Sequence, residues 1–416
     1  MGVEFDPHSH RWKQDPYPMY RRLRDESPVH YAPDSDTWTV SRHADVVRVL
    51  TTPEVFSSKM FGSQSREFRQ NMRMRDAMRL MVRFLWRMRA APWKMAKSRM
   101  LILEDGEVHA LMRNIVNRGF TPRRIRVWDG RIRELANDGL VRLRTHGEFD
   151  LMEELAIPLP VTVISELLGI ERERRDDFKR WSDAIIQGGT GSTMGLGSPE
   201  LFDAMADLRS YLRPIVRSRR AEPQDDLIST LCEAEGTAAL DDFEIFMFVL
   251  LLLVAGNETT TNLLGNTVDA LLEHPDQLER VRSDPSLIPG LVEEALRYDG
   301  PIQFLNRVAR SDFELDGVTI PKDARVVVLL GSANRDERRY PEPDRFDVTR
   351  DTRGHVAFGL GAHFCLGAAL ARLEARAALE VLVPELASLA RSRPEREFLD
   401  SYQIRGRSRL ELRRAA

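Results

Sequence analysis

The stretch FGLGAHFCLGAAL, residues 358–370, decides how the rest of the sequence is interpreted. Gly359 and Gly361 allow the backbone to form a tight loop, and Gly367 lets the following helix approach a flat group closely. Cys365 stands at the amino terminus of that helix, where the helix dipole and the unpaired N–H groups favour a thiolate over a thiol. A lone cysteine is more often an inert packing residue. Here the flanking glycines favour a metal-binding loop instead.

The composition agrees with an ordinary soluble protein. Of the 416 residues 42% are hydrophobic and 30% are charged, and the net charge of -3 predicts no general attraction to nucleic acid. The two cysteines, Cys232 and Cys365, lie in such different contexts that we expect no disulfide and a reducing, cytoplasmic compartment. A zinc site would need more ligands than His355 and His363 beside the cysteine.

Helical periodicity dominates, so we predict a mainly α protein with a small β region. The longest helix is expected to begin at Asp241, with Glu244 completing a capping box, and to run to about His274. The apolar run within it is too short to span a membrane, and the amino terminus lacks the pattern of a signal peptide. Other helices are expected near 108–118, 129–145, 152–168, 171–187 and directly after Cys365, and a further one in DPYPMYRRLRDESPV, before the strand WTVSR.

The β region is predicted after Pro301. FELDGVTI contains a hairpin turn at Asp316-Gly317, and Pro321 to Ala324 connects it to the strand RVVVLL. The sequence shows no internal repeat and no interdomain linker. We therefore predict a single catalytic domain over residues 1–416.

The cysteine segment resembles the haem-binding loop of the cytochrome P450 family, F-G-x-G-x-H-x-C-x-G, at every fixed position. The resemblance implies the cytochrome P450 fold, with a long central helix over haem b and the cysteine loop before the last long helix. It makes Cys365 the proximal iron ligand, places His363 near a haem propionate and packs Phe358 against the thiolate side. Gly359 and Gly367 then belong to the cofactor-binding loop.

The central helix contains AGNETT, residues 255–260, which brings polar groups into an apolar helix. Taken alone, the threonine is as well explained by a helix bend in which its hydroxyl bonds its own turn. Beside the cysteine loop the segment resembles the acid–alcohol pair of the family. That resemblance makes Thr259 the residue that holds dioxygen and its water, and Glu258 the proton relay. Glu258 replaces the commoner aspartate, and Asn257 is more polar than usual, which could alter the helix bulge or add a substrate contact.

Glu294 and Arg297 lie three residues apart on a helix and by themselves indicate only a surface ion pair. They resemble the E-x-x-R pair of the family, which Arg345 in PDRF would complete, with Asp344 where the family usually has glutamate. The implied role is structural support of the cysteine loop.

Three further residues are implied to lie near the haem propionates. His109 and Arg113 are four residues apart and share one face of a helix, and Arg307 follows the break at Pro301. Each is also compatible with a solvated surface position. Cationic and hydrogen-bonding groups would offset the two carboxylates of a haem.

Two segments remain open. Residues 66–99 contain eleven Lys or Arg against two acidic residues, with methionines on another helical face. This indicates either a solvated face over a packing face, or a substrate-access element that meets a membrane surface or an anionic substrate or partner. The glycine-rich loop at 188–198 is either a lid hinge or a plain connector.

The sequence thus predicts a haem-thiolate monooxygenase that inserts one oxygen atom from dioxygen into an apolar organic substrate. The chain has too few cysteines for an iron–sulfur cluster and no room for a fused reductase, so a separate ferredoxin and ferredoxin reductase are expected. Two alternatives stay open: a haem-binding sensor or carrier without turnover, and a peroxygenase or isomerase on the same fold.

Overall fold

The protein is described by a computed structural model. It covers residues 3–414 apart from 8, 10–11, 13, 60–81, 83–86, 89–97, 190–198, 235 and 237–238. Its contacts divide the chain into two compact units that interleave along the sequence. Unit 1 comprises Met1–Ser57, Ile125–Pro160 and Thr259–Ala416, and unit 2 comprises Ser58–Arg124 and Val161–Glu258.

Unit 1 holds the strands of the described chain. The largest sheet has the order β1-β2-β8-β5-β3, in which β2 and β8 are parallel. A second sheet has the order β4-β10-β9, and β6 and β7 form a hairpin. The strands are β1 (Val29–Ala32), β2 (Thr37–Val40), β3 (Phe56–Ser57), β4 (Glu148–Asp150), β5 (Phe304–Ala309), β6 (Phe313–Leu315), β7 (Val318–Ile320), β8 (Arg325–Leu329), β9 (Leu389–Arg391) and β10 (Glu411–Arg414).

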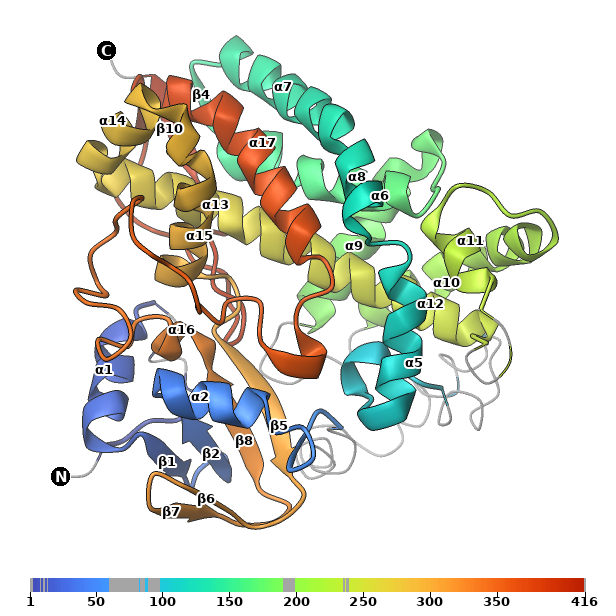
Figure 1. The fold of residues 1–416 in the computed structure, drawn as a ribbon. Helices are drawn as coiled ribbons and strands as arrows, with labels where there is room; N and C mark the ends of the chain where they lie inside the picture. Colours follow the sequence, from blue (N-terminus) through green and yellow to red (C-terminus); the bar gives the residue numbers. More distant parts are fainter. Residues whose placement is uncertain are drawn as a thin grey trace. The chain divides into compact units, whose positions relative to one another are not determined.

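The apolar run RVVVLL is explained by β8, which is buried on both faces. Val326 and Val328 pack with α2 (His43–Leu50), while Val327 and Leu329 pack with α1 (Tyr17–Glu26). Because successive side chains of a strand point to opposite faces, a strand covered on both sides reads as a continuous apolar run. Figure 1 shows α1 and α2 beside this sheet. The predicted turn at Asp316-Gly317 is confirmed, since both residues have positive φ.

The longest helix of unit 1, α17, follows the cysteine loop (Figure 1). It packs against α7, α14 and α15, and small alanines on its buried face allow close contact. The remaining helices of this unit are α7 (Asp129–Thr145), η4 (Met152–Ala156), α13 (Glu258–Glu273), α14 (Pro275–Ser283), η8 (Pro285–Leu287), α15 (Ile288–Asp299), α16 (Leu330–Ala333), η9 (Gly361–His363) and α17 (Ala368–Leu386).

Unit 2 is helical in its described part, and its most extensive helix–helix contact is between α9 and α10. Its elements are η3 (Leu101–Leu103), α5 (Gly106–Asn117), η5 (Arg172–Arg174), α9 (Arg175–Gly189), α10 (Pro199–Ala221), α11 (Leu227–Cys232), α12 (Asp242–Leu252) and η7 (Leu253–Asn257). Three helices, α6 (Pro122–Val127), α8 (Pro158–Leu167) and α13 (Glu258–Glu273), contain points where the chain passes between the units.

The predicted central helix begins and ends as expected. Asp241 caps it, and the side chain of Glu244 bonds back to the Asp241 N–H, which completes the capping box. The helix is continuous to Glu273 but consists of α12, the π-helical turn η7 and α13 (Glu258–Glu273). By length and composition it resembles a membrane span, yet 67% of its most apolar window is buried within the protein. This burial is typical of a core helix.

Candidate functional site

The cysteine loop is closed by its own backbone. The Cys365 N–H donates to the Phe358 carbonyl at 2.9 Å, and the Phe364 N–H donates to the Gly361 carbonyl at 3.1 Å. Gly359 and Gly361 have φ values of 67° and 69°, in the region that favours glycine. The sequence prediction of a tight glycine-dependent loop is therefore confirmed.

The surroundings of the loop explain where glycine is required. A Cβ on Gly361 would lie 2.7 Å from the Leu50 carbonyl oxygen at the end of α2, whereas nothing lies within 4 Å of a Cβ on Gly367. Gly367 caps the amino terminus of α17, so the helix start next to Cys365 faces open space. The guanidinium of Arg372 lies over the Phe358 ring, 4.5 Å from the ring centroid.

The Glu294–Arg297 pair lies in the core of unit 1, and both side chains are 0% exposed. The Arg297 Nε donates to Glu294 Oε2 at 2.7 Å, and its Nη1 donates to the carbonyls of Asn334 and Pro343. A buried, fully bonded pair of this kind fixes the segments whose carbonyls it binds. The alternative of a solvated surface pair is thereby excluded.

The arginine that completes the Glu294–Arg297 pair is not the predicted Arg345. Arg345 contributes only its backbone carbonyl to Arg297, and its side chain is 57% exposed beside Glu342 and Asp347. Arg350 takes the expected place, with its Nε at 3.3 Å from Glu294 Oε1. A turn in which the Arg350 N–H donates to the Asp347 carbonyl lies just before this contact, and the Arg350 side chain is 11% exposed.

The π-helical turn η7 directly precedes Glu258. Glu258 is buried, and its Oε2 has no hydrogen-bond donor within reach in the described part of the chain. Burial raises the pKa of this carboxyl to about 7. The buried acid can therefore be protonated or ionised near neutral pH, as a proton donor must be.

Ala255 and Thr259 are less buried than their neighbours on the central helix. Ala255 is exposed and Thr259 is half-buried, while the neighbouring Asn257, Glu258 and Thr260 are buried. Residues four apart share a helix face, so Ala255 and Thr259 define one stripe. A small residue followed by a hydroxyl on this stripe fits a flat group lying against it.

Sequence reasoning missed Glu374. This residue of α17 is buried, its Oε1 has no hydrogen-bond partner among the described residues, and its carboxyl hydrogen-bonds Thr260. Burial raises the pKa of Glu374 to about 8. In LEARAALE a glutamate looks like an ordinary solvated helix residue, and only the packing of α17 against its neighbours reveals otherwise.

The predicted propionate contacts are divided between the two units. Unit 1 contains Arg307, which is buried on β5, and His363 in η9. Unit 2 contains His109 and Arg113 on α5, where burial lowers the pKa of His109.

The two segments that remained open lie largely outside the described residues. Of 66–99 only positions 82, 87, 88, 98 and 99 are described, and of 188–198 only the last two residues of α9. Both functional interpretations therefore stay predictions.

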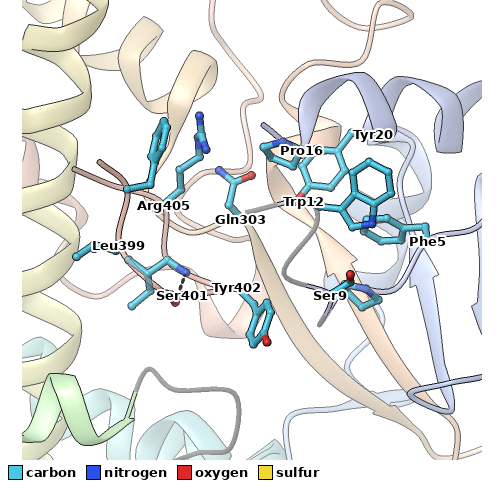
Figure 2. Close-up of a pocket in the computed structure, with 13 residues that line it drawn as sticks. Phe5, Ser9, Trp12, Pro16, Tyr20, Gln303, Leu399, Ser401, Tyr402 and Arg405 are labelled. Atoms are coloured by element: carbon cyan, nitrogen blue, oxygen red, sulfur yellow. Dashed lines mark hydrogen bonds between the residues drawn. The ribbon is translucent and has the colours of Figure 1, made fainter. Parts of the chain in front are cut away.

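A small pocket in unit 1 lies apart from all of these residues (Figure 2). Aromatic side chains of the amino-terminal segment, including Phe5, Trp12 and Tyr20, face the carboxy-terminal loop around Tyr402 and Arg405. None of the predicted site residues lines it. It is not the site that the sequence motifs define.

The comparisons with known proteins identify the family. Residues 197–387 match the family model described as Cytochrome P450. The chain is 39% identical over 411 residues to Cytochrome P450 107B1 of Saccharopolyspora erythraea, covering 97% of this chain and 96% of that protein. It is 40% identical to the Vitamin D(3) 25-hydroxylase of Pseudonocardia autotrophica, covering 95% and 93%. The crystal structure of CYP109E1 from Bacillus megaterium in complex with testosterone matches with a TM-score of 0.81 and 32% identity, covering 97% and 100%.

The chain therefore belongs to the cytochrome P450 family and is a monooxygenase, an oxidoreductase that uses a haem iron. Its residues fit that cofactor. In the described part of the chain no three His, Cys, Asp or Glu side chains gather as a metal site. A single thiol at a helix start with open space beside it suits an iron whose other ligands belong to a macrocycle.

Proposed function

We propose that the chain is a cytoplasmic haem-thiolate monooxygenase with haem b, folded as one catalytic domain. It inserts one oxygen atom from dioxygen into a C–H bond of an apolar substrate, using electrons from a separate ferredoxin and ferredoxin reductase. When bound, the haem supplies the redox chemistry that activates dioxygen.

In this proposal Cys365 binds the iron as a thiolate, and the loop closed by the Cys365 N–H and the Phe358 carbonyl holds the sulfur in place. Gly359 and Gly367 let the loop and the helix start approach the cofactor. His363 and Arg307, together with His109 and Arg113, bind its propionates. The buried Glu294–Arg297 pair supports the loop from the core, with Arg350 in the place first assigned to Arg345.

The observation that carries the proposal is the buried carboxyl of Glu258. A buried acid next to Thr259, with one oxygen unbonded among the described residues and a pKa of about 7, suits proton delivery. A haem-binding sensor or carrier needs no such group. Glu258 relays protons in this scheme, and Thr259, the next residue, orients dioxygen and its water.

A steroid-sized apolar substrate is the class we propose to test first. One relative is named for its action on vitamin D(3), and one solved structure holds testosterone. Both compounds are rigid, apolar and multicyclic. Vitamin D(3) and testosterone should shift the optical spectrum of the haem-loaded protein from low spin to high spin.

Thr259→Ala tests the reaction. We expect normal haem content and a ferrous carbonyl spectrum of thiolate type, but more hydrogen peroxide for each reductant consumed, because protons are no longer directed to dioxygen. Thr267→Ala is the matched control, since Thr267 lies on the same helix and, among the described residues, its hydroxyl bonds only the Leu263 carbonyl, at 2.6 Å. Unchanged coupling of reductant to product in Thr259→Ala would contradict the assigned role.

The open alternatives are separated by the need for electrons. A monooxygenase consumes reductant and dioxygen in step with product. A peroxygenase makes product from peroxide alone, an isomerase needs neither, and a sensor or carrier makes no product. A carbonyl spectrum of imidazole type would remove the Cys365 assignment altogether.

A further inference from the structure

A buried hydrogen bond joins α9 to the π-helical turn of the central helix. The Asn257 side chain donates through Nδ2 to Ser182 Oγ at 2.9 Å, across 75 residues of sequence. Asn257 is 3% exposed and Ser182 is 0% exposed. Both residues belong to unit 2. Because water does not reach this contact, water would not replace the hydrogen bond if one of the two side chains were removed.

The position of the bond within the helix matters. Asn257 is the last residue of η7, and Glu258 is the first residue of α13. A π-turn holds one residue more than an α-turn, so its backbone bonds are poorer and tertiary contacts decide whether it persists. If the turn relaxed to regular α-helix, residues before it would rotate by about 100° relative to those after it.

A second contact restrains the same turn. A Cβ on Gly256 would lie 2.9 Å from Cδ1 of Ile164 on α8, so the turn is seated closely against that helix. The packing of Gly256 restrains how far the backbone approaches α8. The polar bond of Asn257 fixes the rotation of the turn about the helix axis, since it is directional.

The helix that carries Ser182 is itself anchored. Trp181 is buried, and its ring lies 5.5 Å from that of Tyr211 on α10. The guanidinium of Arg174 lies 5.1 Å from the centroid of the Tyr211 ring. The packing of α9 against α10 therefore fixes the position of Ser182, to which the π-turn is hydrogen-bonded.

We propose that Ser182 and Asn257 are positioning residues, whose hydrogen bond holds η7 as a π-turn and thereby sets the direction in which Glu258 projects. The inference rests on the proposed function for its catalytic consequence, though not for the contact itself. A movement of α9 that breaks this bond would release the turn and displace the acid. The position of α9 is thus coupled to proton delivery.

Ser182→Ala in the haem-loaded full chain tests the contact directly. Hydrogen–deuterium exchange of peptides covering 250–262 should become about fivefold faster, because one hydrogen bond that resists local opening is lost. Ser165→Ala is the matched control: Ser165 is also 0% exposed in unit 2, but within the described part of the chain its hydroxyl bonds only the Thr162 carbonyl of its own helix. Exchange in 250–262 that is unchanged in Ser182→Ala, or equally faster in Ser165→Ala, would overturn the proposal.

The catalytic consequence is read as peroxide released for each reductant consumed, with testosterone as the probe. Ser182→Ala should approach the value of Glu258→Gln, and Ser182→Thr, which keeps the hydroxyl, should restore the wild-type value. The double variant Ser182→Ala/Asn257→Ala should release no more peroxide than Asn257→Ala alone, because that single variant already removes the bond that Ser182 makes. Additive effects would show that the two residues act separately and would refute the shared role.

The failure of this inference is distinguishable from failure of the proposed function. If Glu258→Gln itself leaves the peroxide yield unchanged, the relay assignment is wrong, while the exchange experiment still decides whether the bond holds the turn. If Glu258→Gln raises the yield but Ser182→Ala does not, the relay stands and the positioning role falls.

Discussion

Replacing Glu374 by glutamine should change how the stability of the protein depends on pH. Glu374 is 2% exposed, and its carboxyl bonds only Thr260 among the described residues. Burial raises its pKa from 4.5 to about 8. The folded protein therefore keeps this acid protonated at pH values where the unfolded chain has already released the proton.

Proton linkage gives the direction and the size of this pH dependence of stability. A raised carboxyl pKa gives stability that is complete below the unfolded pKa and is lost as pH rises toward the folded pKa. The loss is about 1.4 kcal/mol for each pH unit between the two values. From pH 5 to pH 8 the wild type should lose about 4 kcal/mol through this group. Glutamine is nearly isosteric, does not titrate and avoids the loss.

The assay is urea unfolding of the haem-loaded wild type and Glu374→Gln at pH 5, 6, 7 and 8. The stability of the variant relative to wild type should rise across this range, as a widening gap between the two unfolding midpoints. Glu380→Gln controls for the amide substitution, because Glu380 lies on the same helix but is 31% exposed and pairs with Arg376. A gap between Glu374→Gln and wild type that stays constant with pH would show that the buried carboxyl is not protonated, and the reasoning would fail.

Three further outcomes are expected. Product formed for each reductant consumed should fall as pH rises through about 7 in the wild type, because burial raises the pKa of Glu258 to that value, and Glu258→Gln should abolish this inflection. Arg297→Met should lower the free energy of unfolding by about 3–5 kcal/mol and reduce haem content, since a buried carboxylate loses its bidentate partner. Arg345→Met changes an exposed side chain, so its free energy of unfolding should stay within about 0.5 kcal/mol of the wild type. Urea unfolding measures both variants. Gly361→Ala should lower the free energy of unfolding by about 1–3 kcal/mol through its positive φ alone, and by more because its Cβ would meet the Leu50 carbonyl oxygen. Gly147→Ala, which has open space for a Cβ, should be nearly neutral. Thermal unfolding compares the two variants. Equal losses in the last two variants would contradict the role given to the loop glycine.

The sequence alone determined the features that short-range interactions control. The Asp241–Glu244 capping box, the turn at Asp316-Gly317 and the glycines of the cysteine loop each act within a few residues, so their types and spacing predict the local backbone. The same holds for α7, whose predicted range 129–145 is the range observed.

Only the tertiary structure decided which polar groups are buried and what they meet. Arg350 reaches Glu294 across 56 residues, where the sequence favoured Arg345. Asn257 meets Ser182 across 75 residues, and Glu374 looked like any solvated helix residue until its neighbours were known. The physical reason is that desolvation and hydrogen bonding depend on what surrounds a side chain in space, and periodicity gives the face of a helix without naming its partner.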